Sequence, residues 1–232
     1  MADLSRSEAL LGAEAMARLA SASVAVVGVG GVGGWCAEAL ARTGVGRIAV
    51  FDDDVVAPSN ANRQCAATSA TMGRVKVEAM RERLLAVNPE VRVDAFNVRW
   101  PADPAAAPDI SGYDCVVDAI DSVDCKASLL LAAIDAGVPV VSSMGAALRL
   151  DPTKVVVRRF DKVEGDGLAR ALRRRFRTAG RLSEAKFPCV CSLELPAAMP
   201  ESGMKGSVMP VVCAFGMALA AEAIKACCAR KL

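Results

Sequence analysis

Glycines and a carboxylate near the start of the chain are spaced as in a nucleotide-binding loop. Gly28, Gly30 and Gly33 follow an apolar run over residues 24–27 and show the spacing G-x-G-x-x-G. Glycines in this pattern permit a tight turn after a strand and let backbone N–H groups approach a phosphate at the N-terminus of the next helix. Asp52 ends the next apolar run, where a carboxylate accepts hydrogen bonds from ribose hydroxyls. The pattern predicts a bound nucleotide.

Further along, the chain supplies charged side chains that suit a triphosphate. A helix N-terminus can largely accommodate one pyrophosphate, whereas a triphosphate needs cations and a metal as well. Arg63 offers a planar fork for phosphate, and Lys76 offers a point charge. The segment DAIDS then places two carboxylates, Asp118 and Asp121, at the end of another predicted strand, on the carboxyl edge where ligands of such sheets bind, and Asp121 suits a hard cation such as Mg²⁺. We therefore predict ATP and Mg²⁺ at this site.

The absence of histidine narrows the chemistry, since the chain contains no residue of this type. This excludes the commonest general base, the Ser/His and Cys/His nucleophile pairs, and zinc sites that use imidazole. Carboxylate, arginine, lysine, cysteine and backbone groups remain to carry out any reaction.

The elements that must position these residues follow an alternating pattern. Short apolar, β-branched runs predict strands, and amphipathic segments between them predict helices. The strands are expected over residues 24–27, 47–51, 91–96, 115–118 and 138–142, and helices over residues 8–20, 32–43 and 75–87. This order predicts an α/β, Rossmann-like fold with a mainly parallel sheet and flanking helices.

The chain changes character after residue 151. A strand-like VVVRRF segment, a basic helix, a polar loop over residues 187–206 and an apolar helix over residues 206–221 follow one another. No repeat or clear linker separates them from the rest. We therefore expect residues 1–232 to form a single domain, with residues 151–232 as a C-terminal extension for substrate binding or dimerisation.

Composition and charge restrict location and partners. The chain has 232 residues, 53% of them hydrophobic, and its net charge is only +2, so any nucleic-acid contact must be local. The first residues lack the apolar segment of a secretory signal, and we expect the nine cysteines to be reduced in the cytoplasm. The apolar stretch over residues 206–221 is shorter than the roughly 20 residues of a membrane span, which favours a buried helix.

Several longer segments resemble a known group of enzymes. GVGGVG, FDDDVVAPSNANRQ, TMGRVKVE and DAIDS are similar to the adenylating core of the ubiquitin-activating-enzyme superfamily. Within it, LSRSEALLG, EALARTGVG, VVDAIDSVDCK, SMGAALRLDPTK and GLARALRRRFRTAG resemble the bacterial tRNA threonylcarbamoyladenosine dehydratases. The resemblance covers most of the chain and implies the adenylating-enzyme type of the Rossmann-like fold.

The resemblance also implies roles for individual residues. Asp121 would bind Mg²⁺, and Asn62 and Arg63 would orient the phosphates. Arg6 lies where the superfamily has an arginine that reaches the triphosphate held by the other subunit of a homodimer, and with Lys76 these residues form the catalytic set. The residues that would contact the nucleotide are Gly28, Gly30, Gly31, Gly33, Asp52, Ser59, Asn62, Arg63, Lys76, Asp121 and Ser122.

The implied reaction starts from tRNA that carries threonylcarbamoyladenosine. The threonyl carboxylate would attack the α-phosphate of ATP, giving an acyl adenylate and pyrophosphate. The carbamoyl group of the same modification would then close onto the activated carbonyl and expel AMP, with net loss of water. Such a reaction needs no imidazole, because the carboxylate is already ionised at pH 7.

Other functions remain open at this point. An adenylyltransferase that activates the C-terminus of a small ubiquitin-like sulfur carrier would use the same ATP site, and a sulfur-relay protein is a further possible partner. An NAD-dependent oxidoreductase would need only the glycines and Asp52, and would leave Arg63 and Asp121 unexplained. A non-catalytic binding module would form no AMP with any carboxylate.

Cysteines and arginines raise two more hypotheses. Sulfur-transfer members of the superfamily carry paired CxxC motifs, whereas this chain has Cys189 and Cys191 one residue apart and Cys227 next to Cys228, so we expect no zinc. Cys65, Cys189 or Cys191 could act as a thiolate nucleophile. A cluster of arginines in the basic segment could follow a tRNA backbone: Arg170, Arg173, Arg174, Arg175, Arg177 and Arg181.

Overall fold

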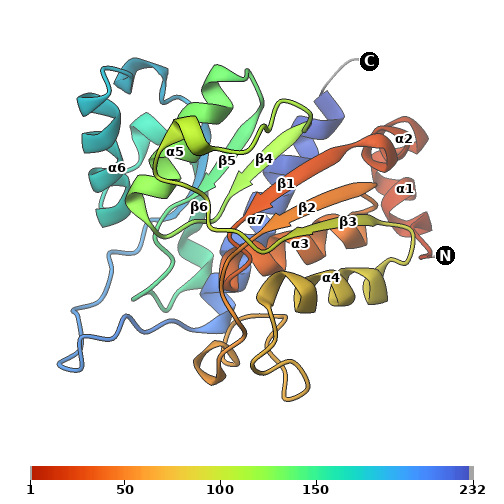
Figure 1. The fold of residues 1–232 in the computed structure, drawn as a ribbon, viewed down its shortest axis with the longest axis horizontal. Helices are drawn as coiled ribbons and strands as arrows, with labels where there is room; N and C mark the ends of the chain where they lie inside the picture. The colour runs from red at the N-terminus through yellow and green to blue at the C-terminus, as the bar shows by residue number, and fades with distance from the viewer. Residues whose placement is uncertain (1, 230–232) are drawn as a thin grey trace.

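The protein is built on one twisted, seven-stranded sheet, seen in a computed structural model that describes residues 2–229 (Figure 1). The strand order is β3-β2-β1-β4-β5-β7-β6, and only β6 runs antiparallel to its neighbour. The strands are β1 (Ser23–Val27), β2 (Arg47–Phe51), β3 (Arg92–Phe96), β4 (Cys115–Asp118), β5 (Val140–Ser143), β6 (Val155–Arg159) and β7 (Pro188–Ser192). The predicted α/β, Rossmann-like class with a mainly parallel sheet is confirmed.

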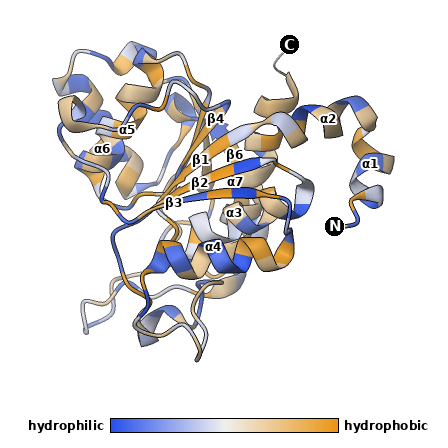
Figure 2. Ribbon diagram, turned by 45° about the vertical axis from the view of Figure 1, so that its right-hand side comes forward, coloured by the Kyte–Doolittle hydropathy of each residue, from blue (hydrophilic) through white to orange (hydrophobic). Residues whose placement is uncertain are grey.

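Helices cover both faces of the sheet, as parallel strands require. One face carries α3 (Gly31–Thr43), α4 (Lys76–Val87) and α7 (Met209–Ala229), and the other carries α5 (Val123–Asp135) and α6 (Gly167–Thr178). In Figure 2 the strands between the two layers are coloured mainly hydrophobic. Each face of the sheet therefore has its own core, with α3 packed closely along α7 in one and α5 along α6 in the other.

The chain begins with two short helices where the sequence predicted one. The segment expected to be helical over residues 8–20 forms α1 (Ser5–Leu11) and α2 (Ala13–Ser21). Gly12 separates them with a φ of +84°, a left-handed conformation that glycine adopts without steric cost. The prediction of one continuous helix over residues 8–20 was therefore wrong.

The polar loop predicted over residues 187–206 was also wrong in part. Its first residues form β7, which inserts between β5 and β6 and is buried from Cys189 to Ser192. Reduced cysteine packs as a small apolar residue, so PCVCS behaves as a core strand although it lacks the usual β-branched composition. The insertion joins the segment after residue 151 to the sheet.

Helix α7 is longer than the predicted apolar helix and begins at Met209. Pro210 lies in its first turn, where proline removes no hydrogen bond. Among the described residues α7 is the helix long and apolar enough to cross a membrane by length and composition, and 44% of its most apolar stretch is buried. Its side chains Phe215 and Leu219 are fully buried in the core shared with α3.

Candidate active site

A cavity of about 790 Å³ opens at the carboxyl ends of the central parallel strands. Ligands of open α/β sheets bind at this edge, where loops from neighbouring strands converge. Most of the residues singled out from the sequence line this cavity: Gly28, Gly30, Gly31, Asp52, Arg63, Lys76, Asp121 and Ser122. The sequence segments that carry them lie far apart in the chain and meet only in the fold.

The glycine loop between β1 and α3 needs its glycines for two different reasons. Gly28 has a φ of +86°, and a Cβ there would lie 2.8 Å from the carbonyl oxygen of Ala119. A Cβ on Gly33 would lie 1.8 Å from the carbonyl oxygen of Gly28, so Gly33 permits close packing and does not itself line the cavity. Helix α3 starts at Gly31 with no side chain capping it, which leaves the helix N-terminus available to an anion.

Asp52 and Lys76 form a charged group next to this loop. Asp52 Oδ2 accepts a hydrogen bond from the backbone N–H of Val29 at 2.8 Å, which ties the end of β2 to the glycine loop. Lys76 Nζ lies 3.2 Å from Asp52 Oδ1 and 2.8 Å from Asp54 Oδ2, with its side chain only 4% exposed. The carboxylates compensate the cost of burying the ammonium beside the cavity.

The loop before α4 presents Arg63 at the cavity. Its Nη1 donates hydrogen bonds of 2.9 Å to the carbonyl oxygen of Ser59 and to Asn62 Oδ1. The indole Nε1 of Trp35 donates to the carbonyl oxygen of Arg63 at 3.0 Å, and Asn62 Nδ2 donates to the carbonyl oxygen of Ser207 at 3.0 Å. Ser59 and Asn62 therefore hold Arg63 in place and do not themselves line the cavity.

The two carboxylates of the DAIDS segment have different environments. Asp121 lines the cavity, but Asp118 is fully buried, so the expectation that both face the ligand edge was wrong for Asp118. Asp118 Oδ2 lies 2.7 Å from Lys126 Nζ, and Lys126 also donates to the carbonyl oxygen of Ile120 at 2.9 Å. Burial raises the pKa of Asp118 although Lys126 opposes the shift. This buried pair shapes the loop that carries Asp121.

Carboxylates at the cavity provide oxygen donors of the kind that Mg²⁺ prefers. Asp52, Asp53 and Asp54 bring their oxygens within 4.8 Å of one another, and Asp121 lies on the same cavity. Lys76 already pairs with Asp52 and Asp54, which leaves Asp121, with Asp53, as the cavity carboxylates whose chemistry fits a divalent hard cation.

Comparison with known proteins agrees with this geometry. The model of the ThiF family matches residues 4–231. The chain belongs to the ThiF family. An Escherichia coli tRNA threonylcarbamoyladenosine dehydratase is 42% identical over 169 residues, which cover 73% of this chain and 63% of that protein.

A solved structure and a second relative complete the comparison. The crystal structure of an Escherichia coli tRNA N6-threonylcarbamoyladenosine dehydratase in complex with AMP superposes with a TM-score of 0.90 at 37% identity, covering 96% of this chain and 92% of that one. The molybdopterin-synthase adenylyltransferase of Salmonella typhimurium is 33% identical over 212 residues, covering 91% of this chain and 75% of that protein. The fold is therefore shared along nearly the whole chain.

Arg6 lies at the other end of the sheet from the cavity. It is an exposed residue of α1, which packs with α2 before the amino end of β1 (Figure 1). Of the predicted catalytic residues, Arg63, Lys76 and Asp121 line the cavity, Asn62 lies behind Arg63, and Arg6 is on an element remote from the cavity.

Several cavity residues were missed by the sequence analysis. Arg99 follows β3, and its pKa is raised by the thiol of Cys125 and the carboxylates of Asp53 and Asp121. The rule that strand ends meet at the ligand edge could have found Arg99. A second wall is formed by residues 144–149 and 166–168 with Lys205 and Ser207. Residues 144–149 lie within the SMGAALRLDPTK segment that carries the family resemblance, but the resemblance gave them no role in the site.

The three cysteines considered as nucleophiles are buried. Cys65 lies against Met80, and burial raises its pKa to about 12. Burial likewise raises the pKa of Cys189 and of Cys191. These thiols stay protonated at neutral pH, so the structure argues against a thiolate nucleophile at these positions.

The arginines of α6 and the loop after it fall into two groups. Arg173 turns inward to the carbonyl oxygen of Phe160 at 3.0 Å, Arg175 pairs with Asp124, and Arg181 pairs with Asp135 and Glu184. Of the six arginines of this cluster, three are exposed and have no ion-pair partner among the described residues: Arg170, Arg174 and Arg177. Only this second group is available to an external polyanion.

Proposed function

We propose that the protein is an ATP-dependent tRNA threonylcarbamoyladenosine dehydratase. The observation that carries the proposal is one cavity with two walls, one bearing the glycine loop, Arg63, Lys76 and Asp121, and the other open to a second substrate. The likeness to a dehydratase structure holding AMP supports the same conclusion. The protein is then an enzyme that activates a carboxylate.

The nucleotide wall would bind ATP through groups of different kinds. The N-terminus of α3 and the guanidinium of Arg63 would neutralise phosphate charge, and Asp52 would accept hydrogen bonds from the ribose. The Lys76 ammonium, now shared by two carboxylates, would supply positive charge close to the phosphates. Asp121 would hold Mg²⁺, which when bound neutralises phosphate charge.

The reaction then proceeds by carboxylate activation. An oxygen of the threonyl carboxylate forms a bond to the α-phosphorus while the bond to pyrophosphate breaks. The carbamoyl group attacks the resulting acyl carbonyl, AMP leaves, and the cyclised base has lost one water. Arg63 and Lys76 would stabilise the charge that develops on the phosphates, so positioning and electrostatics replace a general base.

We further propose a homodimer in which Arg6 of one subunit reaches the triphosphate of the other. Helix α1, which carries Arg6, lies at the opposite end of the sheet from the cavity (Figure 1), and Arg6 does not line the cavity of its own chain, which supports this assignment. Residues 151–232 would form the substrate and dimerisation extension of a single adenylating domain, with exposed arginines of α6 following the tRNA backbone. We place the enzyme in the cytoplasm, where a sulfur-relay protein could also bind it.

The alternative is adenylation of a sulfur-carrier protein, favoured by the likeness to a molybdopterin-synthase adenylyltransferase. AMP formation should be measured with tRNA carrying threonylcarbamoyladenosine, with the same tRNA lacking the modification, and with a small ubiquitin-like carrier. AMP only with the modified tRNA, and restoration of the cyclic nucleoside in a deletion strain, are the expected results. AMP with the carrier alone would support the alternative.

A further inference from the structure

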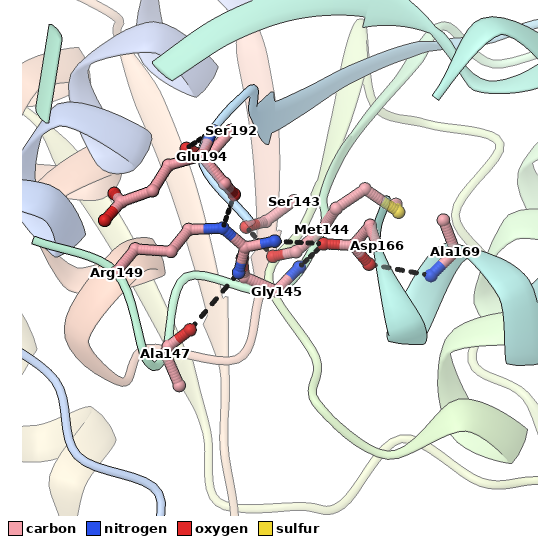
Figure 3. A network of polar contacts seen from close by, with 9 residues as sticks. All are labelled: Ser143, Met144, Gly145, Ala147, Arg149, Asp166, Ala169, Ser192 and Glu194. Atoms are coloured by element: carbon pink, nitrogen blue, oxygen red, sulfur yellow. Dashed lines mark hydrogen bonds and ion pairs between the residues drawn. The ribbon is translucent and has the colours of Figure 1, made fainter. Parts of the chain in front are cut away.

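The second wall of the cavity is held by a buried ion pair outside the nucleotide site. Arg149 Nη2 lies 3.0 Å from Asp166 Oδ2, and the two side chains are 3% and 1% exposed (Figure 3). Asp166 Oδ2 also accepts the backbone N–H of Gly145 at 3.1 Å, and Asp166 Oδ1 caps α6 by accepting the N–H of Ala169 at 2.9 Å. One carboxylate thus joins the start of α6 to the loop after β5.

Arg149 uses its remaining donors on the same loop and on the segment after β7. It donates to the carbonyl oxygens of Gly145 and Ala147, the latter at 3.2 Å, and its Nε donates to the carbonyl oxygen of Glu194 at 3.2 Å. The Glu194 carboxylate in turn accepts the backbone N–H of Leu150 at 3.1 Å. The guanidinium is the centre of this network, and three chain segments are fixed to it.

The loop over residues 144–148, called the wall loop here, is held in an unfavourable conformation. Leu148 has a φ of +61° and is the non-glycine residue with positive φ in the described part of the chain. A left-handed leucine costs about 1 kcal/mol or more and persists only where the surroundings enforce it. The backbone of Leu148 is held directly by hydrogen bonds to Gly206 and from Ala197, and the Arg149 and Asp166 contacts fix the neighbouring Gly145 and Ala147.

The wall loop has hydrogen-bond donors left over. The backbone N–H groups of Ala146 and Ala147 have no acceptor among the described residues, and both residues line the cavity. Unpaired amide donors held by a rigid loop suit an oxygen that gains negative charge during acyl transfer. The wall loop lies in the same cavity as Asp121 and the glycine loop but has no ion pair with the charged residues there.

We propose that Arg149 and Asp166 are positioning residues that hold the wall loop so that it binds the acyl group of the carboxylate substrate. The inference rests on the proposed function for the identity of that substrate. The pair acts on the carboxylate half of the reaction and leaves ATP binding to the opposite wall.

Asp166→Asn tests this role, because the amide oxygen can still cap α6 while its NH₂ group cannot accept from Gly145 or Arg149. We expect ATP affinity within about twofold of wild type and a loss of AMP formation with modified tRNA of about 100-fold, the typical cost of misplacing a reacting group. Arg149→Lys keeps the charge but loses the fork, so an intermediate loss is expected. Arg159→Lys is the control, since its exposed pair with Asp161 lies outside the cavity and should change neither quantity.

The possible outcomes separate the two hypotheses. Equal loss of ATP affinity and turnover in both variants, or unchanged turnover in a folded Asp166→Asn protein, would overturn the positioning role. If Asp166→Asn fails to fold, the Arg149→Lys comparison decides alone. If wild type forms no AMP with modified tRNA, the proposed function fails. The variants are then compared with the carrier protein as acceptor, where reduced turnover at unchanged ATP affinity still supports the positioning role.

Discussion

The two walls of the cavity are built in different ways. On the nucleotide wall, glycines and charged residues follow directly on strands β1, β2 and β4, so each element delivers its functional residue at its own end. On the opposite wall, Arg149 contacts Asp166 and Glu194. The three residues belong to three separate segments that only the fold brings together. The comparison teaches that a generic nucleotide site depends on local motifs, whereas the site for a particular acyl substrate depends on long-range contacts.

The strongest test of the nucleotide wall is Asp121→Ala. Its carboxylate would hold the metal, and charge neutralisation of this kind contributes several kcal/mol to the transition state. We expect AMP formation to fall by at least about 1,000-fold with any carboxylate substrate, with partial recovery at high magnesium. AMP release and the melting temperature should be measured together. Normal turnover in the folded variant would remove Asp121 from the mechanism.

Arg6→Ala tests whether an arginine from another subunit completes the cavity that the two walls form. Because an arginine aimed at developing phosphate charge acts mainly on rate, we expect nearly unchanged ATP binding and AMP formation slower by about 1,000-fold. Mixed Arg6→Ala and Asp121→Ala chains should regain activity, since one of the two sites in a mixed dimer contains both intact residues. A mixture that stays inactive after proven subunit exchange would contradict the assignment in trans.

Lys126→Met tests the buried support behind Asp121. The substitution leaves Asp118 buried and unpaired, which typically costs about 3–5 kcal/mol of the free energy of unfolding. Burial already raises the pKa of Asp118, and loss of Lys126 removes the opposing effect, so the folded state will favour the protonated carboxyl. Stability is then greatest at low pH and is lost as pH rises through the raised pKa.

Denaturant titrations of Lys126→Met at pH 5 and pH 8 measure this effect. The loss in free energy of unfolding, relative to wild type, should be smaller at pH 5 than at pH 8. Adding Asp118→Asn should recover part of the loss and remove the pH dependence. If Lys126→Met were as stable as wild type at both pH values, the Asp118–Lys126 pair would not support the loop.

Asp52→Ala should affect nucleotide affinity more than turnover. It removes the ribose acceptor and the 2.8 Å hydrogen bond to Val29 that anchors the glycine loop. Loss of hydrogen bonds to a charged group costs about 1.5–3 kcal/mol, so ATP should bind about 10-fold to 100-fold more weakly. Calorimetric titration with ATP checks this, and the Arg149→Lys variant, which alters the other wall, should bind ATP normally.

The smallest expected effect concerns tRNA affinity. Replacing Arg170, Arg174 and Arg177 by Gln removes three exposed charges while keeping the ion pairs of Arg175 and Arg181. If these side chains contact phosphates, the slope of log K against log salt should fall by about 2–3. Adenylation at saturating tRNA should be unchanged. An unaltered slope would show that α6 does not follow the tRNA backbone.

Much of the nucleotide wall could be predicted from the sequence because its signals are local. A glycine spacing, an apolar run and a charged residue at the end of that run are all visible within a few residues, as at Gly28, Asp52 and Asp121. The same logic predicted strands β1 to β5 of the parallel part of the sheet but missed β7, whose composition is not typical of a strand. It was wrong for Asp118, because one residue of strand length decides whether a side chain faces the ligand edge or the core.

By itself the sequence determined the fold class, the charged residues that suit a triphosphate and the absence of histidine chemistry. The tertiary structure decided that PCVCS is a core strand, that Asp118 pairs with Lys126, that Arg6 lies far from its own cavity, and that Arg149 and Asp166 hold the second wall. The physical reason is the range of the interactions involved. Helix and strand periodicity depends on neighbours along the chain, whereas burial and ion pairing depend on which distant segments the sheet order brings into contact.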